Sequence, residues 1–91
     1  MIDPRRRGGA VQVQVRLSAP LAQMAGSARF VVHLGEGATV GDLRRRLAMQ
    51  QPVLDPGLAR ALALVRGAHA GADQVLAHGD EVALLLPVAG G

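Results

Sequence analysis

The residues with the clearest chemical use lie at the end of the sequence, where the apolar run "EVALLLP" continues into "PVAGG", residues Pro87 to Gly91. Glycine contributes no side-chain packing and has the largest backbone entropy to lose. A Gly-Gly end therefore favours a tail that threads a narrow channel in which a Cβ would clash. Gly91 would present its α-carboxylate at the tip of that tail. The alternative is that the two glycines are an ordinary frayed end.

A carboxylate at Gly91 could carry sulfur once it is activated. Adenylation by ATP would convert it into a mixed anhydride, and attack by sulfide or a persulfide would give a C-terminal thiocarboxylate. The sequence contains no cysteine, which excludes disulfides and thiolate metal sites, so a sulfur atom would need another group to hold it. We therefore expect no bound cofactor, with ATP used by an activating partner.

Other catalytic groups lack the spacing that catalysis needs. The three histidines, His33, His69 and His78, are far apart and do not have metal-ligand spacing. Asp80 and Glu81 are neighbours, but consecutive residues of a strand point to opposite faces and cannot form a carboxylate pair. Asp80 is expected to stabilise a turn instead. The sequence therefore predicts a non-catalytic protein without a metal site.

The composition argues against nucleic acids and membranes as partners. The net charge is +3 and every basic residue is arginine, but Phe30 is the single aromatic residue, so no platform exists on which bases could stack. Residues 1–9, with Arg5 to Arg7, are expected to be a disordered leader. No apolar stretch approaches the roughly 20 residues that cross a bilayer, and no signal peptide is apparent. A cytoplasmic location is the default expectation, and an arginine-rich binding module ranks last among the functions.

The elements that would position the tail follow from the hydrophobic pattern. Residues 11–17 alternate apolar and polar side chains, which is typical of a half-buried strand, and residues 28–34 repeat the pattern after a predicted loop at 18–27. Strands are also predicted at 61–67 and 81–86, with irregular chain or a short helical turn from residue 52. The fold class is therefore α+β: a β-grasp over residues 10–86, in which a mixed sheet packs on one main helix, its first and last strands are adjacent, and residues 87–91 form a flexible tail.

One helix is predicted between residues 39 and 51. Thr39 is placed to cap it, and Asp42 lies in its first turn, where the helix dipole favours an anion. The apolar stripe comprises Val40, Leu43 and Leu47. The i,i+4 spacing would allow Asp42 to pair with Arg46. The three consecutive arginines at 44–46 are interpreted as a solvated face, and an acidic partner for them is the second choice.

The last thirteen residues, "GDEVALLLPVAGG", resemble the ending of the small ubiquitin-like sulfur carriers, above all the small subunit of molybdopterin synthase. The resemblance extends more weakly to "VQVRLSAPLAQMAG", "ATVGDLRRRLA" and "ALALVRG". It implies that Gly91 becomes the thiocarboxylate and that Gly90 lies with it in the active-site channels of partner enzymes, preceded by Pro87, Val88 and Ala89. The sulfur would go to a cyclic pterin precursor in the biosynthesis of the molybdenum cofactor.

The resemblance also implies partners. These are an E1-like adenylating enzyme, a large molybdopterin synthase subunit in a heterotetramer, and a desulfurase or rhodanese-type sulfur donor. Leu85 and His69 match positions that the family uses for docking. The sequence departs from the family where aromatic residues are common, since it has Leu17, Ser18, Leu84 and Leu85, and His69 replaces an apolar residue. These departures bear on which partner docks and leave the tail chemistry intact.

Other functions share the same tail. Sulfur delivery to cysteine or another thiolated metabolite is a second carrier function, because those relatives end in a nearly identical "VAGG". Carriers for thiazole formation are usually shorter and lack the proline, so they rank lower. A ubiquitin-like modifier joined to target lysines through Gly91 would use the same adenylate. The absence of lysine excludes chains built through its own side chains.

Overall fold

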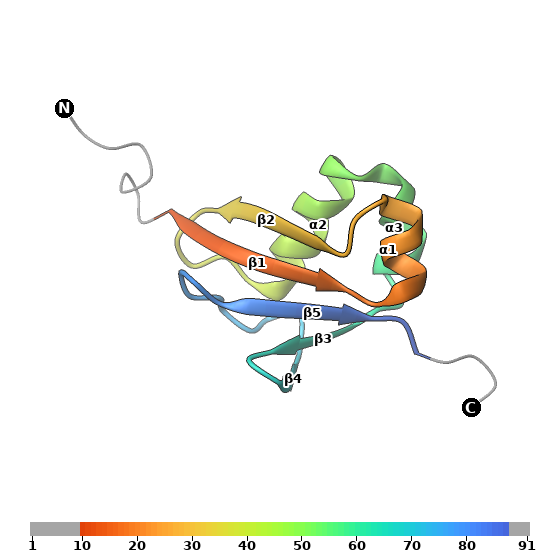
Figure 1. Ribbon diagram of the computed structural model, residues 1–91. Coiled ribbons are helices and arrows are strands. Elements are labelled where there is room, and N and C mark those ends of the chain that lie inside the picture. The colour runs from red at the N-terminus through yellow and green to blue at the C-terminus, as the bar shows by residue number, and fades with distance from the viewer. Residues whose placement is uncertain (1–9, 88–91) are drawn as a thin grey trace.

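The computed structural model describes residues 10–87 of the chain (Figure 1), and the leader with Arg5 to Arg7 and residues 88–91 lie outside this range. Five strands form one sheet in the order β2-β1-β5-β3-β4. The strands are β1 (Val11–Leu17), β2 (Arg29–Leu34), β3 (Leu62–Val65), β4 (Ala68–Ala70) and β5 (Glu81–Leu85). The helices are α1 (Ala19–Ala25), α2 (Val40–Gln50), the 3₁₀ turn η2 (Pro52–Leu54) and α3 (Asp55–Leu58).

The first and last strands lie side by side in the sheet and run in the same direction (Figure 1). Val15 lies opposite Val82, and Leu17 lies opposite Leu84. All other strand pairs are antiparallel. This mixed sheet with α2 packed on it confirms the predicted α+β class and the β-grasp arrangement. No helix within residues 10–87 is long and apolar enough to cross a bilayer.

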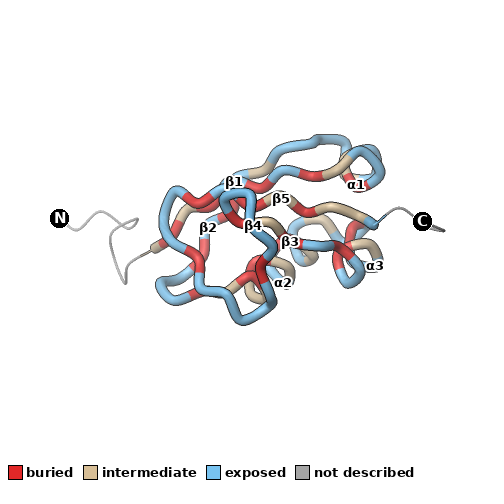
Figure 2. Tube along the Cα trace, turned by 90° about the horizontal axis from the view of Figure 1, so that it is seen from below, coloured by how far each residue is buried: buried red, intermediate tan, exposed pale blue. Residues whose placement is uncertain are grey.

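The hydrophobic core lies on one face of the sheet because apolar residues alternate along the strands. In Figure 2 the buried residues of the strands alternate with more exposed ones. The buried residues of the strands are Val11, Val13, Val15, Leu17, Val32, Leu34, Ala63, Val65, Ala70, Val82 and Leu84. The predicted stripe of α2, Val40, Leu43 and Leu47, is fully buried against them. Burial of these side chains is the main favourable contribution to folding.

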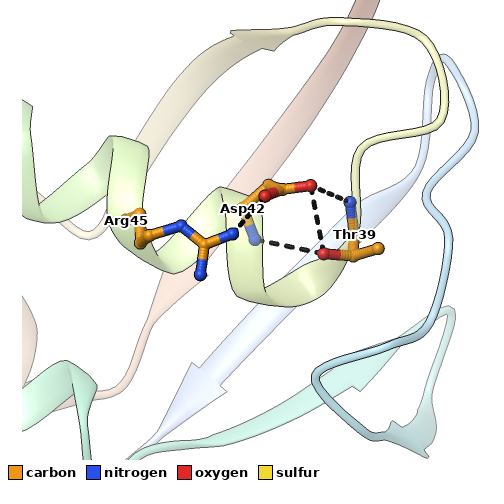
Figure 3. A network of polar contacts seen from close by, with 3 residues as sticks. All are labelled: Thr39, Asp42 and Arg45. Atoms are coloured by element: carbon orange, nitrogen blue, oxygen red, sulfur yellow. Dashed lines mark hydrogen bonds and ion pairs between the residues drawn. The ribbon is translucent and has the colours of Figure 1, made fainter.

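Helix α2 begins with a reciprocal cap (Figure 3). The Thr39 hydroxyl accepts from the Asp42 N–H at 3.2 Å, and the Asp42 carboxylate accepts from the Thr39 N–H at 2.9 Å. The second carboxylate oxygen of Asp42 is bound by Arg45. The Asp42–Arg46 pair that the spacing allows is therefore not formed. Because the cap draws Asp42 back towards Thr39, its free oxygen meets the arginine three residues later rather than four.

The segment 18–27 is a helix where the sequence predicted a loop. Pro20 lies in the first turn of α1, where the missing N–H is not needed. Gly26 ends the helix with φ +79°, and its N–H donates to the Ala22 carbonyl at 2.8 Å. Proline and glycine often interrupt regular structure, but at these positions they mark the start and end of a helix. Leu21 is the fully buried residue of α1 and fixes it to the core.

Candidate functional site

None of the described residues covers the face of the sheet that points away from the core. We call it the outer sheet face, and none of its residues is buried. It comprises Gln12, Gln14 and Arg16 of β1, Arg29, Val31 and His33 of β2, Leu62 and Leu64 of β3, His69 of β4, and Glu81, Ala83 and Leu85 of β5. The outer sheet face is therefore a broad surface that the described residues leave open to solvent.

One half of the outer sheet face is apolar. Leu85 lies opposite Leu62, and Ala83 lies opposite Leu64, in the antiparallel pair of β5 and β3. We call these four residues the apolar patch. Leu62 is 43% exposed, and the other three residues of the patch are half-buried. Because large contiguous apolar patches mark interaction surfaces, the apolar patch is a candidate docking surface.

The two predicted docking residues of the folded domain share this face. Leu85 belongs to the apolar patch, whereas its neighbour Leu84 is fully buried on the core side. His69 is exposed and lies opposite Leu64 across the β3–β4 pair. The strand register thus places Leu85, on the central strand β5, and His69, on the edge strand β4, on the same face of the sheet, although they are sixteen positions apart in sequence.

A single row of residues crosses all five strands on the outer sheet face. The register places Arg29 opposite Arg16, Arg16 beside Ala83, Ala83 opposite Leu64, and Leu64 opposite His69. Ala83 is the smallest member and lies in the middle strand. The row therefore has two arginines at one end, a shallow apolar centre and a histidine at the other end. Sequence patterns predict the faces of strands, but only the register joins them into such a row.

The base of the tail is held by Ser18, which the sequence analysis did not single out as functional. The Ser18 N–H donates to the Leu84 carbonyl at 3.0 Å, and the Ser18 hydroxyl accepts from the Leu86 N–H at 3.2 Å. Leu86 also packs against the core. These contacts hold the chain as far as Leu86, and Pro87 is exposed. A Ser-x-Pro signal for a helix start was present at Ser18, but its bond to Leu86 is a long-range contact that local patterns do not show.

The start of β5 is held by Asp80, as predicted for a turn residue. Its carboxylate accepts from the Ala77 N–H at 2.8 Å and lies 3.5 Å from the guanidinium of Arg66. Its N–H donates to the Ala77 carbonyl, and its carbonyl accepts from the Gln14 N–H, both at 3.0 Å. Asp80 is only 5% exposed. It therefore sets where β5 begins against β1, and so where the strand releases the tail.

The structure does not bring the histidines together. His33 and His69 lie on the two edge strands of the sheet, and His78 lies in the turn before β5, where its Nδ1 accepts from the Gln12 N–H at 3.1 Å. Within residues 10–87 no cluster of His, Cys, Asp or Glu side chains could hold a metal ion. The predicted tail residues Val88, Ala89, Gly90 and Gly91 lie outside the described range, so their roles stay predictions.

The chain matches the ThiS family over residues 15–91, whereas no curated protein matches it. Among solved structures it is similar to small archaeal modifier protein 1 of Haloferax volcanii, with 31% identity, a TM-score of 0.80, and coverage of 86% of this chain and 99% of that one. A protein from Pyrococcus furiosus described as a molybdopterin converting factor, subunit 1, has 28% identity, a TM-score of 0.78, and coverage of 86% and 99%.

The complex of subunits 1 and 2 of the molybdopterin-converting factor of Helicobacter pylori contains a chain with the same fold. It has 22% identity, a TM-score of 0.63, and coverage of 89% of this chain and 100% of that one. The family match covers β5 and the tail as well as most of the domain. The chain therefore belongs to the ThiS family and is a small ubiquitin-like protein of the sulfur-carrier or modifier type.

Proposed function

We propose that this protein is a sulfur carrier whose reacting group is the carboxylate of Gly91. The observation that carries the proposal is the family match, which continues through residue 91 and so includes the tail beyond the folded sheet. In the first step the carboxylate attacks the α-phosphorus of ATP, forming an acyl adenylate and releasing pyrophosphate. In the second step a sulfur nucleophile attacks the acyl carbon and AMP leaves. With sulfide, loss of its proton gives the thiocarboxylate directly; with a persulfide, reductive cleavage of the S–S bond by a thiol completes the step.

The fold suits this chemistry because it fixes the base of the tail. Ser18 and the packing of Leu86 hold the chain where β5 ends, next to the apolar patch. Four residues follow Pro87, and an extended stretch of that length spans at most about 14 Å. A partner that covers the apolar patch would therefore need its active site within about that distance of Pro87. Leu85 and His69 are the docking residues that we propose on the folded domain, with Pro87 to Gly90 in the partner's channel.

The acceptor that we propose is the pterin precursor of molybdopterin. Similarity to the Pyrococcus furiosus protein described as molybdopterin converting factor, subunit 1, supports this pathway. The partners would be an E1-like adenylating enzyme that uses ATP, a sulfur-donating desulfurase or rhodanese-type protein, and a large synthase subunit that supplies the catalytic groups. The carrier itself would bind no cofactor and act as the non-catalytic subunit, in the cytoplasm.

The second candidate is a ubiquitin-like modifier. Its specific support is the 31% identity to small archaeal modifier protein 1 over 99% of that chain. In this case a lysine amine of a target protein would attack the activated acyl group, and an amide would replace the anhydride. Both candidates need the adenylating enzyme and differ only in the nucleophile.

Intact-mass measurement tests the shared chemistry and the carrier function. Incubation with ATP, an E1-like adenylating enzyme and a sulfur source should exchange one oxygen of the chain for sulfur, and fragmentation should place the change on Gly91. Deletion of Gly91, or extension beyond it, should abolish the product. Gly90→Ala should fold normally and react slowly, because a Cβ would clash in a tight channel. If the protein without Gly91 were thiocarboxylated as well as the intact protein, the proposal would be wrong.

A second measurement separates the two acceptors. The thiocarboxylated protein is mixed with a large synthase subunit and the pterin precursor, and formation of the dithiolene is measured. In parallel, cell extract containing ATP and the adenylating enzyme is searched by mass spectrometry for lysines linked to a peptide that ends at Gly91. Dithiolene formation without lysine conjugates supports the molybdopterin pathway, and the reverse result supports the modifier.

A further inference from the structure

Two arginines face each other on the outer sheet face. Arg16 of β1 lies directly opposite Arg29 of β2 in the antiparallel register. Like charges at such cross-strand positions are close together and destabilise a sheet. The pair is thus an unfavourable choice for the stability of the isolated domain, unless the two guanidinium groups bind a shared anion.

The described residues do little to neutralise this pair. The nearest carboxylate is Glu81, whose Oε1 lies 3.8 Å from Nη1 of Arg16, and both side chains are about half exposed, at 51% and 55%. An ion pair so long and so exposed contributes little. Arg29 has no acidic partner within residues 10–87. The end of the row at β1 and β2 therefore keeps an excess of positive charge.

The arginines border a hollow that can receive a side chain. Its volume is about 190 Å³, and it is lined by Gln14, Val15, Arg16, Arg29, Phe30, Val31 and Glu81. Arg16 also lies beside Ala83 in the parallel register, so the hollow adjoins the apolar patch. Guanidinium groups bind carboxylates through paired, charge-assisted hydrogen bonds. An apolar patch next to a pair of arginines resembles a protein interface, which has a hydrophobic centre and a polar rim.

We propose that Arg16 and Arg29 together bind an aspartate or glutamate side chain of the enzyme that adenylates the tail, while an apolar surface of that enzyme covers the apolar patch. This inference rests on the proposed function, since it assigns the chemistry of a partner to the same face. A protein carboxylate fits better than a nucleic-acid phosphate because the outer sheet face has no aromatic side chain among the described residues on which a base could stack. Glu81 then competes with the incoming carboxylate for Arg16.

The experiment measures the dissociation constant between the full-length chain and the E1-like adenylating enzyme by calorimetry. Arg16→Ala and Arg29→Ala should each weaken binding by about tenfold, the loss expected when one charge-assisted hydrogen bond is removed. Glu81→Gln should tighten binding several-fold, since it removes the competing carboxylate. The matched control is Arg46→Ala, which removes the same charge from an exposed position on α2, across the sheet from the outer face.

Salt dependence provides an independent readout. Raising the ionic strength from about 0.05 M to about 0.5 M screens exposed charges, so the wild type and Arg46→Ala should lose affinity strongly. The double variant Arg16→Ala/Arg29→Ala should lose much less, because the screened contact is already gone. Circular dichroism of each variant verifies that the domain is folded, and removal of the repulsion between the two arginines is expected to leave it at least as stable.

The outcomes separate the two proposals. The inference fails alone if the wild type is thiocarboxylated but Arg16→Ala and Arg29→Ala bind the adenylating enzyme with the same affinity as Arg46→Ala. Equal affinities, whether all unchanged or all reduced, would show that the arginine pair is not the anion site. If Glu81→Gln weakens binding, Glu81 does not compete with the partner's carboxylate for Arg16, and the inference fails as well. If the wild type is neither bound nor modified by adenylating enzymes, the proposed function fails, and this inference with it.

Discussion

The hydroxyl of Ser18 accepts a hydrogen bond from the backbone N–H of Leu86 at a distance of 3.2 Å, although 68 positions separate the two residues in the sequence. Ser18 also precedes α1, and its side chain makes no capping bond to that helix. The hydroxyl oxygen of Ser18 is therefore bonded to the chain at the end of β5 and not to α1. The start of α1 and the base of the tail form one structural unit, and loosening of either should loosen the other.

Substitution of Ser18 tests this unit. Ser18→Ala removes the acceptor of the Leu86 N–H, so we expect the free energy of unfolding to fall by about 1 kcal/mol and amide exchange at Leu86 to accelerate. Urea denaturation and amide exchange measured by NMR check the two effects. Ser27→Ala is the control, because within residues 10–87 the Ser27 hydroxyl bonds only to the nearby exposed backbone of Arg29. Equal stability losses in both variants, with unchanged exchange at Leu86, would contradict the prediction.

Substitution of the neighbours Leu84 and Leu85 should reduce stability to different extents. Leu84 is fully buried, so Leu84→Ala should cost about 2–5 kcal/mol. Leu85→Ala should cost less, because Leu85 is only half-buried on the outer sheet face. Leu85→Glu should leave the monomer folded and weaken binding of the partner enzyme. Circular dichroism and urea denaturation measure folding, and calorimetry measures binding. A Leu85→Glu variant that is already unfolded in the absence of urea would show that the apolar patch belongs to the core.

The cap of α2 predicts a dependence of stability on pH. The hydrogen bond from the Thr39 N–H, followed by the contact with Arg45, lowers the pKa of Asp42 below its ordinary value of 3.8. Because the folded-state pKa is the lower one, the stabilisation is fully present above pH 3.8 and is lost as the pH falls through the folded-state pKa. The stability difference between the wild type and Asp42→Asn should therefore be largest near neutral pH and shrink in acid.

Urea denaturation at a series of pH values measures that difference. Thr39→Ala should lower the stability by about 1 kcal/mol near neutral pH. Asp73→Asn removes an exposed carboxylate without a hydrogen bond to the described residues and is the control. A difference that grows in acid, or that is the same for Asp73→Asn, would disprove the role assigned to Asp42.

Because the carboxylate of Asp80 is buried, we expect substitutions of Asp80 to lower the stability by amounts that depend on the new side chain. Asp80→Ala leaves the Ala77 N–H without its acceptor and should cost about 1–3 kcal/mol. Asp80→Asn keeps an oxygen that can accept this bond and should cost less. Thermal denaturation compares the two variants. If asparagine were as harmful as alanine, the contact with Arg66 rather than the turn would be the source of the stabilisation.

Most of the fold was predictable where the pattern of a segment and its final environment agree. The alternation from Val11 to Leu17 and the stripe of α2 each require one buried face, and the structure provides it. Helix α1 was missed because Pro20 and Gly26 are compatible with both a loop and a capped helix. The spacing allowed an Asp42–Arg46 pair, but spacing alone does not show that the capping bond redirects the carboxylate.

The candidate site was less predictable because it depends on register. Leu85 and His69 were proposed from the resemblance to a family, but Arg16 and Arg29 were ordinary strand residues until the pairing of β1 and β2 placed them opposite each other. The contact between Ser18 and Leu86 likewise joins segments at the two ends of the domain. Gly91, which the sequence singles out most clearly, lies outside the described residues, so its chemistry rests on the tail sequence and the family match.

The position of β5 in the middle of the sheet has a consequence for synthesis. This strand is the last of those that the structure describes, yet it separates β1 from β3 and contributes Val82 and Leu84 to the core. A nascent chain cannot complete its sheet before residues 81–85 have left the ribosome, because the parallel pairing of β1 with β5 is a contact of very long sequence separation. A chain that ends before β5 would expose unpaired strands and be open to proteolysis. The order of strands thus makes completion of the sheet depend on synthesis of residues 81–85, so that a chain terminated before β5 would lack a complete core.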